Sequence, residues 1–214
     1  MKVLITGGAG FVGSQLSSRF LQEGHTVVGI GRSSRPGAGF PASAKYVSGD
    51  TTRPGECQQE VRDADVIINL AGVSIFGRWT KERKKQVYDS RILTSRNLVD
   101  ALDPARNVTF VSASDVGYFG CSTNKEFTEE DGPGDDFLAR VSRDWEAEAM
   151  KAREKNARVI ITRYGVILDK SGGALGQMMP AFKAFLGGPL GNGSQPFSWL
   201  HMRDLIEATI FLIN

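Results

Sequence analysis

Three glycines near the start of the chain have a spacing that could bind phosphate. Gly7, Gly10 and Gly13 follow the apolar segment Lys2 to Thr6 and precede a segment with helical spacing of apolar residues. Glycines in such a turn allow a tight bend, a close approach of the backbone to a pyrophosphate, and close packing of helix on strand. The helix N-terminus adds free N–H groups and a partial positive charge. The pattern predicts a dinucleotide-binding turn, and a glycine-rich turn without a ligand is the alternative.

Two arginines follow the next apolar segment, Thr26 to Gly31. A site for NAD usually has Asp or Glu about 20 residues after the last glycine, where the carboxylate accepts from the ribose 2′-hydroxyl. This chain has Arg32 and Arg35 there and no acid. A guanidinium can instead bind the adenosine 2′-phosphate through charge-assisted hydrogen bonds. We therefore predict NADP in preference to NAD, and solvated loop cations are the alternative.

The elements that must position these residues alternate along the chain. Short Val- and Ile-rich segments without polar alternation are separated by longer helical patterns, which is typical of βαβ units and a parallel sheet covered on both faces. The sequence thus predicts an α/β fold, a Rossmann-type doubly wound parallel sheet. The expected strands are Lys2 to Thr6, Thr26 to Gly31, Lys45 to Ser48, Val66 to Leu70, Val108 to Ser112 and Arg158 to Arg163. The expected helices are Val12 to Glu23, Lys81 to Leu102 and Asp136 to Asn156.

The last fifty residues have a different sequence pattern. From Gly165 onward, glycine pairs such as Gly172-Gly173 punctuate short apolar segments, which indicates a loop-rich cap around a site. We expect an NADP-binding Rossmann domain over 1–164 and a partial substrate-binding cap over 165–214 that returns to the Rossmann domain. The segment Arg203 to Asn214 has helical spacing and stops without a capping glycine or polar tail, as a truncated chain would.

Composition excludes several classes of protein and partner. With 41% hydrophobic residues in 214, disorder is excluded, and a net charge of +2 gives no clustered basic excess for nucleic acid or an anionic membrane. Cys57 and Cys121 are far apart and indicate neither a disulfide framework nor a zinc site, and no clustered histidines suggest a metal. No apolar stretch reaches the ~18 residues of a membrane span, and the N-terminal residues lack the apolar core that a signal peptide would have. We expect a cytoplasmic protein with a small-molecule partner and no metal.

Further motifs accompany the glycine turn along the whole chain: Asn69-Leu70-Ala71-Gly72, Ser112-Ala113-Ser114, Val116-Gly117-Tyr118-Phe119-Gly120, Asp144-Trp145-Glu146, Arg163-Tyr164-Gly165 and Trp199-Leu200-His201. With them the chain resembles the extended short-chain dehydrogenase/reductase superfamily. The resemblance is to its NAD(P)-dependent epimerase/dehydratase group, in the atypical epimerase-like branch labelled cell-division-inhibitor homologue.

The resemblance implies which residues surround the cofactor. Asp50 would lie near the adenine and Arg91 would approach the cofactor from the following helix, although Asp50 could equally be a turn residue in Gly49-Asp50-Thr51. The pyrophosphate would be lined by Gly7, Gly10, Phe11, Val12 and Gly13, and Leu70, Ala71 and Gly72 would pass beneath the cofactor. The resemblance also implies more chain beyond the position of Asn214 and leaves a homodimer through the two long helices as an option.

The same resemblance identifies a departure at the catalytic positions. The superfamily uses a Ser and a Tyr whose phenol is acidified by a Lys four residues on, and Ser114 matches the serine. The segment Asp135 to Glu146, where the Tyr-x-x-x-Lys pair should stand, contains neither residue. A proton donor or acceptor within reach of the substrate oxygen is still required. Tyr118, Tyr164 and Asp115 are the candidates, and we take Ser114 and Tyr118 as catalytic, with packing as the alternative role of the tyrosine.

Two functions follow from these residues. The first is an NADP-binding oxidoreductase-like or epimerase-like enzyme that acts on a small hydroxyl- or carbonyl-bearing substrate, with sugar nucleotides among the candidates. The second is a catalytically silent NADP-binding sensor or regulatory protein, which the missing Tyr-x-x-x-Lys pair would suit. Turnover of bound NADPH with a carbonyl compound distinguishes them.

Overall fold

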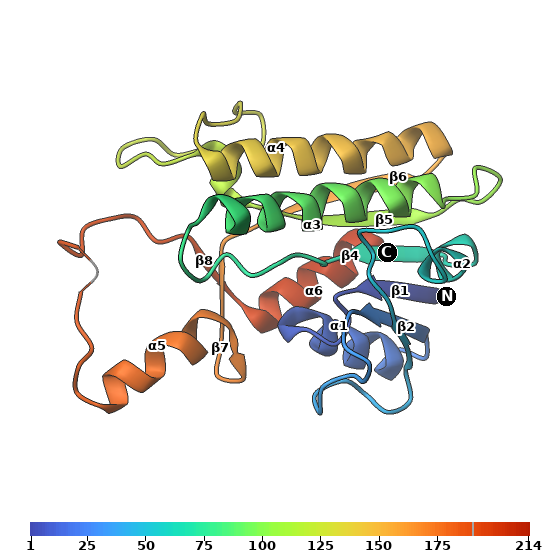
Figure 1. The fold of residues 1–214 in the computed structure, drawn as a ribbon, viewed down its shortest axis with the longest axis horizontal. Helices are drawn as coiled ribbons and strands as arrows, with labels where there is room; N and C mark the ends of the chain where they lie inside the picture. The colour runs from blue at the N-terminus through green and yellow to red at the C-terminus, as the bar shows by residue number, and fades with distance from the viewer. Residues whose placement is uncertain (190) are drawn as a thin grey trace.

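A six-stranded parallel sheet forms the centre of the computed structural model, which describes residues 1–189 and 191–214 (Figure 1). The strand order is β3-β2-β1-β4-β5-β6, so the chain runs outward from β1 to one edge, crosses back to β4 and continues to the other edge. The carboxyl ends of β1 and β4 therefore lie side by side where the direction reverses, which is where open α/β sheets bind ligands. The strands are β1 (Lys2–Thr6), β2 (Thr26–Gly31), β3 (Lys45–Ser48), β4 (Val66–Asn69), β5 (Thr109–Asp115) and β6 (Arg158–Tyr164).

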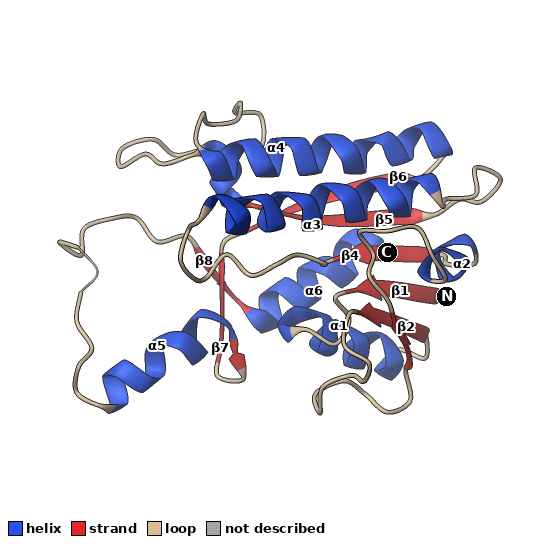
Figure 2. Cartoon of the chain, viewed as in Figure 1, coloured by secondary structure: helices blue, strands red, loops and turns tan. Residues whose placement is uncertain are grey.

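Helices cover both faces of this sheet. One face packs against α1 (Phe11–Gln22) and α6 (Met202–Ile213), through side chains such as Phe20 and Ile206. The other face packs against α2 (Cys57–Arg62), α3 (Lys81–Asp100) and α4 (Phe137–Met150). Figure 2 shows the strands enclosed between the two helical layers. The predicted doubly wound architecture is confirmed.

The central strands show why the sequence folds this way. Leu4 belongs to the core cluster on the α3 side, while its neighbours Val3 and Ile5 belong to the cluster on the α1 side. Successive side chains of a strand point to opposite faces, so a strand buried on both faces must be apolar throughout. Ile67 and Ile68 divide between the two clusters in the same way. The unbroken apolar segments of the sequence are thus explained by two cores that share one sheet.

Residues 165–201 are arranged differently from the body of the sheet. Strand β7 (Val166–Asp169) pairs in parallel with β8 (Trp199–His201), and α5 (Gly173–Lys183) lies between them in sequence. Figure 1 shows α5 projecting away from the large sheet before the chain returns through β8 to α6. Of the α5 residues, only Ala174 is buried, and Phe185 just beyond the helix is 97% exposed.

Several element boundaries differ from the sequence prediction. Strand β5 continues to Asp115 rather than ending at Ser112, because Ala113 to Asp115 pair with β6 up to Tyr164. Helix α4 ends at Met150, and a 3₁₀ helix over Lys151–Lys155 leads to Asn156 in the left-handed region. The sequence prediction missed α2 and α5. The first is only six residues long, and the second contains Gly176 and Pro180, which obscure the helical signal.

Candidate functional site

The glycine turn places backbone against backbone. Gly7 has a φ of +68°, and its N–H donates to the Ile30 carbonyl at 2.8 Å. A Cβ added at Gly13 would lie 2.3 Å from the Gly7 carbonyl oxygen, so α1 reaches this close to the turn only with glycine there. Gly10 is the N-cap of α1 and offers no side chain to the first N–H groups of the helix. Those donors, on Phe11, Val12 and Gly13, are left for an anion.

A cavity of about 150 Å³ opens beside this turn. Five of the expected cofactor residues line it, from four separate segments: Gly7, Arg32, Asp50, and the adjacent Ala71 and Gly72. It is also lined by polar side chains to which the sequence analysis assigned no site role: Thr51, Thr52, Ser90 and Thr94. Ser90 and Thr94 are one helical turn apart on α3, so their spacing could have indicated a common face. The tertiary structure thus brings much of the expected site together.

The other expected cofactor residues lie around this cavity rather than in its lining. Arg35 is exposed in the loop after β2, three residues beyond Arg32. Leu70 directly follows β4, and its N–H donates to the Thr6 carbonyl at 3.2 Å. Gly10, Phe11, Val12 and Gly13 form the start of α1 beyond Gly7. The guanidinium groups of Arg32 and Arg35 form no ion pair with the described part of the chain, so both cations are free to meet an anion.

Asp50 acts as a turn residue at the edge of the cavity. Its Oδ1 accepts hydrogen bonds from the Thr52 N–H at 3.0 Å and the Thr52 hydroxyl at 2.7 Å. The bond from the Thr52 hydroxyl lowers the pKa of the Asp50 carboxyl, and the nearby charges of Arg53 and Arg32 act in the same direction. The turn role that the sequence left open is therefore present, while contact with a ligand stays a prediction.

Arg91 is a largely buried cation beneath Gly72. Its Nη1 donates to the carbonyls of Val73 and Val87, both at 3.1 Å, and its guanidinium lies 5.1 Å from the centre of the Trp145 ring. A Cβ added at Gly72 would lie 3.0 Å from the Arg91 Cζ, so glycine is what leaves the guanidinium room. Burial lowers the pKa of Arg91. The side chain holds the loop after β4 in place beside the cavity.

Ser114 lies within a buried hydrogen-bond network instead of an open pocket. It is 4% exposed, and its hydroxyl donates to Glu146 Oε1 at 2.5 Å. Arg163 binds both oxygens of Glu146, each at 2.8 Å. The Arg163 guanidinium also lies 3.7 Å from the centre of the Tyr118 ring. The two residues expected to be catalytic are thus connected through Glu146 and Arg163, whose roles the sequence analysis did not identify.

The start of α4 shows what replaces the missing Tyr-x-x-x-Lys pair. Phe137 is the first residue of the helix and packs edge-on against Trp79, with ring centres 5.8 Å apart. Lys84 of α3 lies 5.2 Å from the centre of the Phe137 ring, and Val141 is 2% exposed. Counting back from Glu146, the expected tyrosine falls on Phe137 or Leu138 and the expected lysine on Val141 or Ser142, so neither a Tyr nor a Lys is present there. Phe137 and Val141 carry packing contacts instead.

The two other candidates for proton transfer, Asp115 and Tyr164, are both partly buried. Asp115 ends β5, and its Oδ1 accepts from the Gly117 N–H at 2.6 Å. Burial raises the pKa of the Asp115 carboxyl, opposed by that hydrogen bond and by Arg91. Burial likewise raises the pKa of the Tyr164 phenol. Both groups therefore favour their neutral forms more than free side chains do.

The remaining sequence candidates have structural roles or carry no site. His201 caps α6, since its Nδ1 accepts from the Arg203 N–H at 3.1 Å. Within residues 1–189 and 191–214, no group of His, Cys, Asp and Glu could hold a metal ion. In the same part of the chain, no helix is long and apolar enough to cross a membrane.

Comparison with known proteins relates this geometry to a family. The model of the NAD dependent epimerase/dehydratase family matches residues 3–214. A relative from Arabidopsis thaliana, named Epimerase family protein SDR39U1 homolog, chloroplastic, is 40% identical over 212 residues, which are 97% of this chain and 60% of the relative. This chain therefore spans 60% of the length of that relative.

Solved structures agree with the family match. The human epimerase family protein SDR39U1, described with NADPH, has a TM-score of 0.82 and 30% identity, over 100% of this chain and 70% of its own. A nucleoside-diphosphate sugar epimerase from Corynebacterium glutamicum has a TM-score of 0.78 and 33% identity, over 98% of this chain and 43% of its own. The likeness thus includes the sheet, the glycine turn and the segment from 165 to 214.

Proposed function

The chain belongs to the NAD-dependent epimerase/dehydratase family, and from that premise we propose that it binds NADP and serves oxidoreductase-like or epimerase-like chemistry on a small hydroxyl- or carbonyl-bearing substrate. The observation that carries the proposal is the single cavity lined by Gly7, Arg32, Asp50, Ala71 and Gly72. Residues from four segments, each expected to bind cofactor, meet at the carboxyl ends of β1, β2, β3 and β4. Sugar nucleotides are candidate substrates.

The residues present fit NADP. The backbone at Gly7, Gly10 and Gly13 makes room where a Cβ would collide, as a pyrophosphate cradle requires. Arg32 lines the cavity with an unpaired guanidinium and no competing acid at the end of β2, which suits a 2′-phosphate. The human relative described with NADPH supports the same choice. When bound, NADP would supply the hydride acceptor or donor.

The residues of this chain would position the substrate oxygen. Because the Ser114 hydroxyl already donates to Glu146, its oxygen is left to accept a hydrogen bond, which suits a substrate hydroxyl. Arg163 fixes Glu146, and the same guanidinium lies over the Tyr118 ring, so both groups are held in one orientation. In this proposal Ser114 and Tyr118 are the catalytic residues, with Tyr118 exchanging the proton.

A catalytically silent NADP-binding protein is the second candidate. It is favoured by the first turns of α4, where Phe137 or Leu138 and Val141 or Ser142 stand in place of the superfamily's proton-transfer pair. Turnover of NADPH with any carbonyl compound would exclude it.

We also propose the domain division, the oligomeric state and the location that the sequence led us to expect. A Rossmann domain over 1–164, a cap over 165–214 and a homodimer through the long helices are parts of it. The cytoplasm remains the proposed location, although the Arabidopsis relative is named chloroplastic.

The cofactor choice is tested by Arg32→Ala. Loss of a charge-assisted contact to the 2′-phosphate should weaken NADPH about tenfold or more and leave NADH nearly unchanged. Calorimetric titration with each nucleotide measures both affinities. Arg153→Ala is the matched control, since Arg153 is an exposed arginine in the 3₁₀ helix after α4. Equal weakening of both nucleotides by Arg32→Ala would contradict the assignment of Arg32 to the 2′-phosphate.

A further inference from the structure

The start of α5 rests on the ring of a residue in the glycine turn. A Cβ added at Gly172, the N-cap of α5, would lie 3.1 Å from the Phe11 Cδ2, and one added at Gly173 would lie 2.5 Å from the Phe11 Cε1. The backbone approaches the ring this closely because both residues are glycines. Phe11 is also the first residue of α1, where its N–H is one of the donors left for an anion. One residue therefore faces the expected pyrophosphate with its backbone and carries α5 on its side chain.

The helix has few other buried contacts. Of its side chains, only that of Ala174 is buried. Gly173 forms a bridge to Leu168 of β7, and Ile167 of β7 packs against the same core cluster as Phe11. Strand β7 and the Phe11 ring thus seat α5 at its first turn. An element with so few buried apolar contacts opens at a low free energy, so a small change at this seat changes how often the helix is seated.

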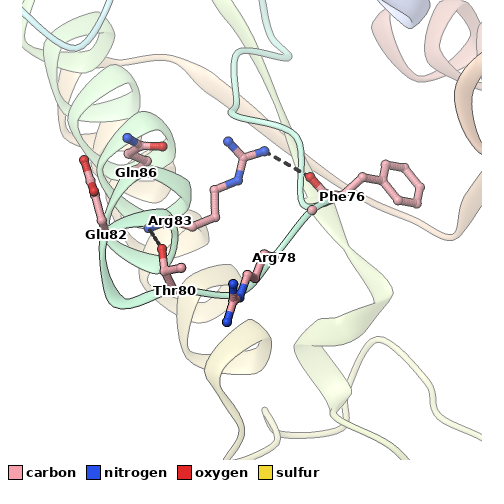
Figure 3. A pocket seen from close by; sticks show the side chains of 7 residues that line it. Phe76, Arg78, Thr80, Glu82, Arg83 and Gln86 are labelled. Carbon is pink, nitrogen blue, oxygen red and sulfur yellow. Dashed lines mark hydrogen bonds between the residues drawn. The ribbon is translucent and has the colours of Figure 1, made fainter.

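A second exposed segment is fastened in a different way. The loop at 76–80 lies along a cavity of about 470 Å³ at the start of α3 (Figure 3). Arg83 of α3 holds this loop, because its Nη2 donates to the carbonyls of Ser74 at 2.6 Å and Phe76 at 3.1 Å. These partners are 9 and 7 residues away in sequence, so the loop is held from within. The seat of α5 depends instead on Phe11, a residue of the nucleotide site near the start of the chain.

We propose that nucleotide binding at the glycine turn and the seating of α5 are coupled through the Phe11 ring. A pyrophosphate bound to the N–H groups of Phe11 and Val12 holds the first turn of α1 and the ring with it. A ring that is already fixed lowers the entropy cost of ordering the start of α5. The occupied cofactor site therefore orders part of the segment that we expect to form the substrate cap. The inference rests on the proposed NADP-binding function, and the coupling is reciprocal, so the seating of α5 strengthens nucleotide binding by the same factor.

Amide hydrogen exchange in α5, measured with and without NADPH at a concentration that calorimetry shows to be saturating, tests this coupling. In the wild type, the α5 amides should exchange about fivefold more slowly with NADPH bound. Phe11→Ala removes the ring and keeps the N–H, so saturating NADPH should then leave exchange in α5 unchanged. The inference is overturned if bound NADPH does not slow exchange in the wild type, or if Phe11→Ala keeps the full protection.

The reciprocal effect is measured as NADPH affinity. Gly173 does not line the cofactor cavity, yet Gly173→Ala should weaken NADPH about fivefold, because its new Cβ displaces the Phe11 ring. In a Phe11→Ala background the same substitution should change the affinity by less than about twofold, since no ring is left to displace. Gly173 has a φ of +60°, and the strain of an alanine there is present in both backgrounds, so it cancels from the comparison. An equal loss of affinity in both backgrounds would contradict a coupling through the ring.

Gly176→Ala is the matched control, because Gly176 lies on the same helix and its added Cβ would meet nothing within 4 Å. Its NADPH affinity should stay within about twofold of the wild type, and NADPH should slow exchange in α5 by the same factor. A loss of affinity in Gly176→Ala as large as that in Gly173→Ala would overturn the inference. A folded wild-type chain that binds no NADPH would overturn the proposed function and this inference together, whereas NADPH binding without a response in α5 would overturn this inference alone.

Discussion

The six-stranded body and the segment 165–201 use apolar residues in opposite ways. In the body, Phe20 and Phe110 are at most 1% exposed, between a sheet and the helices that cover it. In the segment, Phe182 is 55% and Phe185 97% exposed, and Trp199 of β8 is 59% exposed. The body therefore completes its own core, while the segment presents large apolar side chains that the described residues leave uncovered.

This difference separates two parts of the function. Every residue expected to bind cofactor lies between Gly7 and Arg91, on the part of the chain with a closed core. Residues 165–201 of the predicted cap lie in the part whose apolar side chains are exposed, whereas α6 packs against the sheet. We therefore expect nucleotide binding to depend on the body, and recognition of the substrate to depend on the segment. The following predictions test the comparison on which this division rests.

The largest effect is expected from truncating matched phenylalanines. Phe20→Ala should lower the free energy of unfolding by about 3–5 kcal/mol, because it leaves a cavity beneath α1. Phe185→Ala should change the free energy of unfolding by less than about 0.5 kcal/mol, because its ring is already in solvent. Urea unfolding followed by circular dichroism measures both. A cost for Phe185→Ala close to that for Phe20→Ala would show that the segment has a core of its own.

A smaller effect is expected from adding one methyl group to a glycine in each region. In Gly13→Ala the new Cβ would meet the Gly7 carbonyl oxygen at 2.3 Å, so the turn must shift, at about 1–3 kcal/mol. In Gly176→Ala the new Cβ meets nothing within 4 Å, and the helix should gain about 0.5–1 kcal/mol of local stability. Urea unfolding reports the first change, and amide exchange in α5 reports the second. A destabilising Gly176→Ala would mean that α5 packs against something.

The smallest effect is the pH dependence of the free energy of unfolding, which should have opposite signs for an aspartate in the body and one in the segment. Burial raises the pKa of Asp115, so between its usual value of 3.8 and the raised value the native state binds more protons than the unfolded state. Stability from this group is present below that window and falls as pH rises through it. Arg91 is the charged group that opposes the shift. The free energy of unfolding of Asp115→Asn, relative to that of the wild type, should therefore increase as pH rises.

Asp169 in the segment should behave in the reverse manner. Its hydrogen bonds from Ser171 lower its pKa, so its contribution to stability is present above 3.8 and is lost as pH falls through the lowered value. Asp169→Asn should lose stability relative to the wild type near neutral pH and match it in acid. Urea midpoints for both variants from pH 3 to 7 measure these differences. The same sign for both variants would contradict the assignment of the two environments.

Much of the body could be predicted from sequence because its signals are local. The strands at Lys2–Thr6, Thr26–Gly31 and Lys45–Ser48 have the predicted bounds, since each is a short apolar or β-branched segment between turn signals. Strand β5 was predicted to end three residues too early, because its continuation to Asp115 depends on pairing with β6. Helix α5 was missed because Gly176 and Pro180 lower its helical propensity.

The sequence alone determined the family, the doubly wound sheet and the glycine turn, because each rests on residues close together in the chain or on a repeated period. It also determined the absence of a Tyr-x-x-x-Lys pair between Asp135 and Glu146. Only the tertiary structure decided that Ser114 donates to Glu146 and that Arg163 holds Glu146 while lying over Tyr118. These contacts join side chains from different elements, and their directions depend on how helices pack on the sheet.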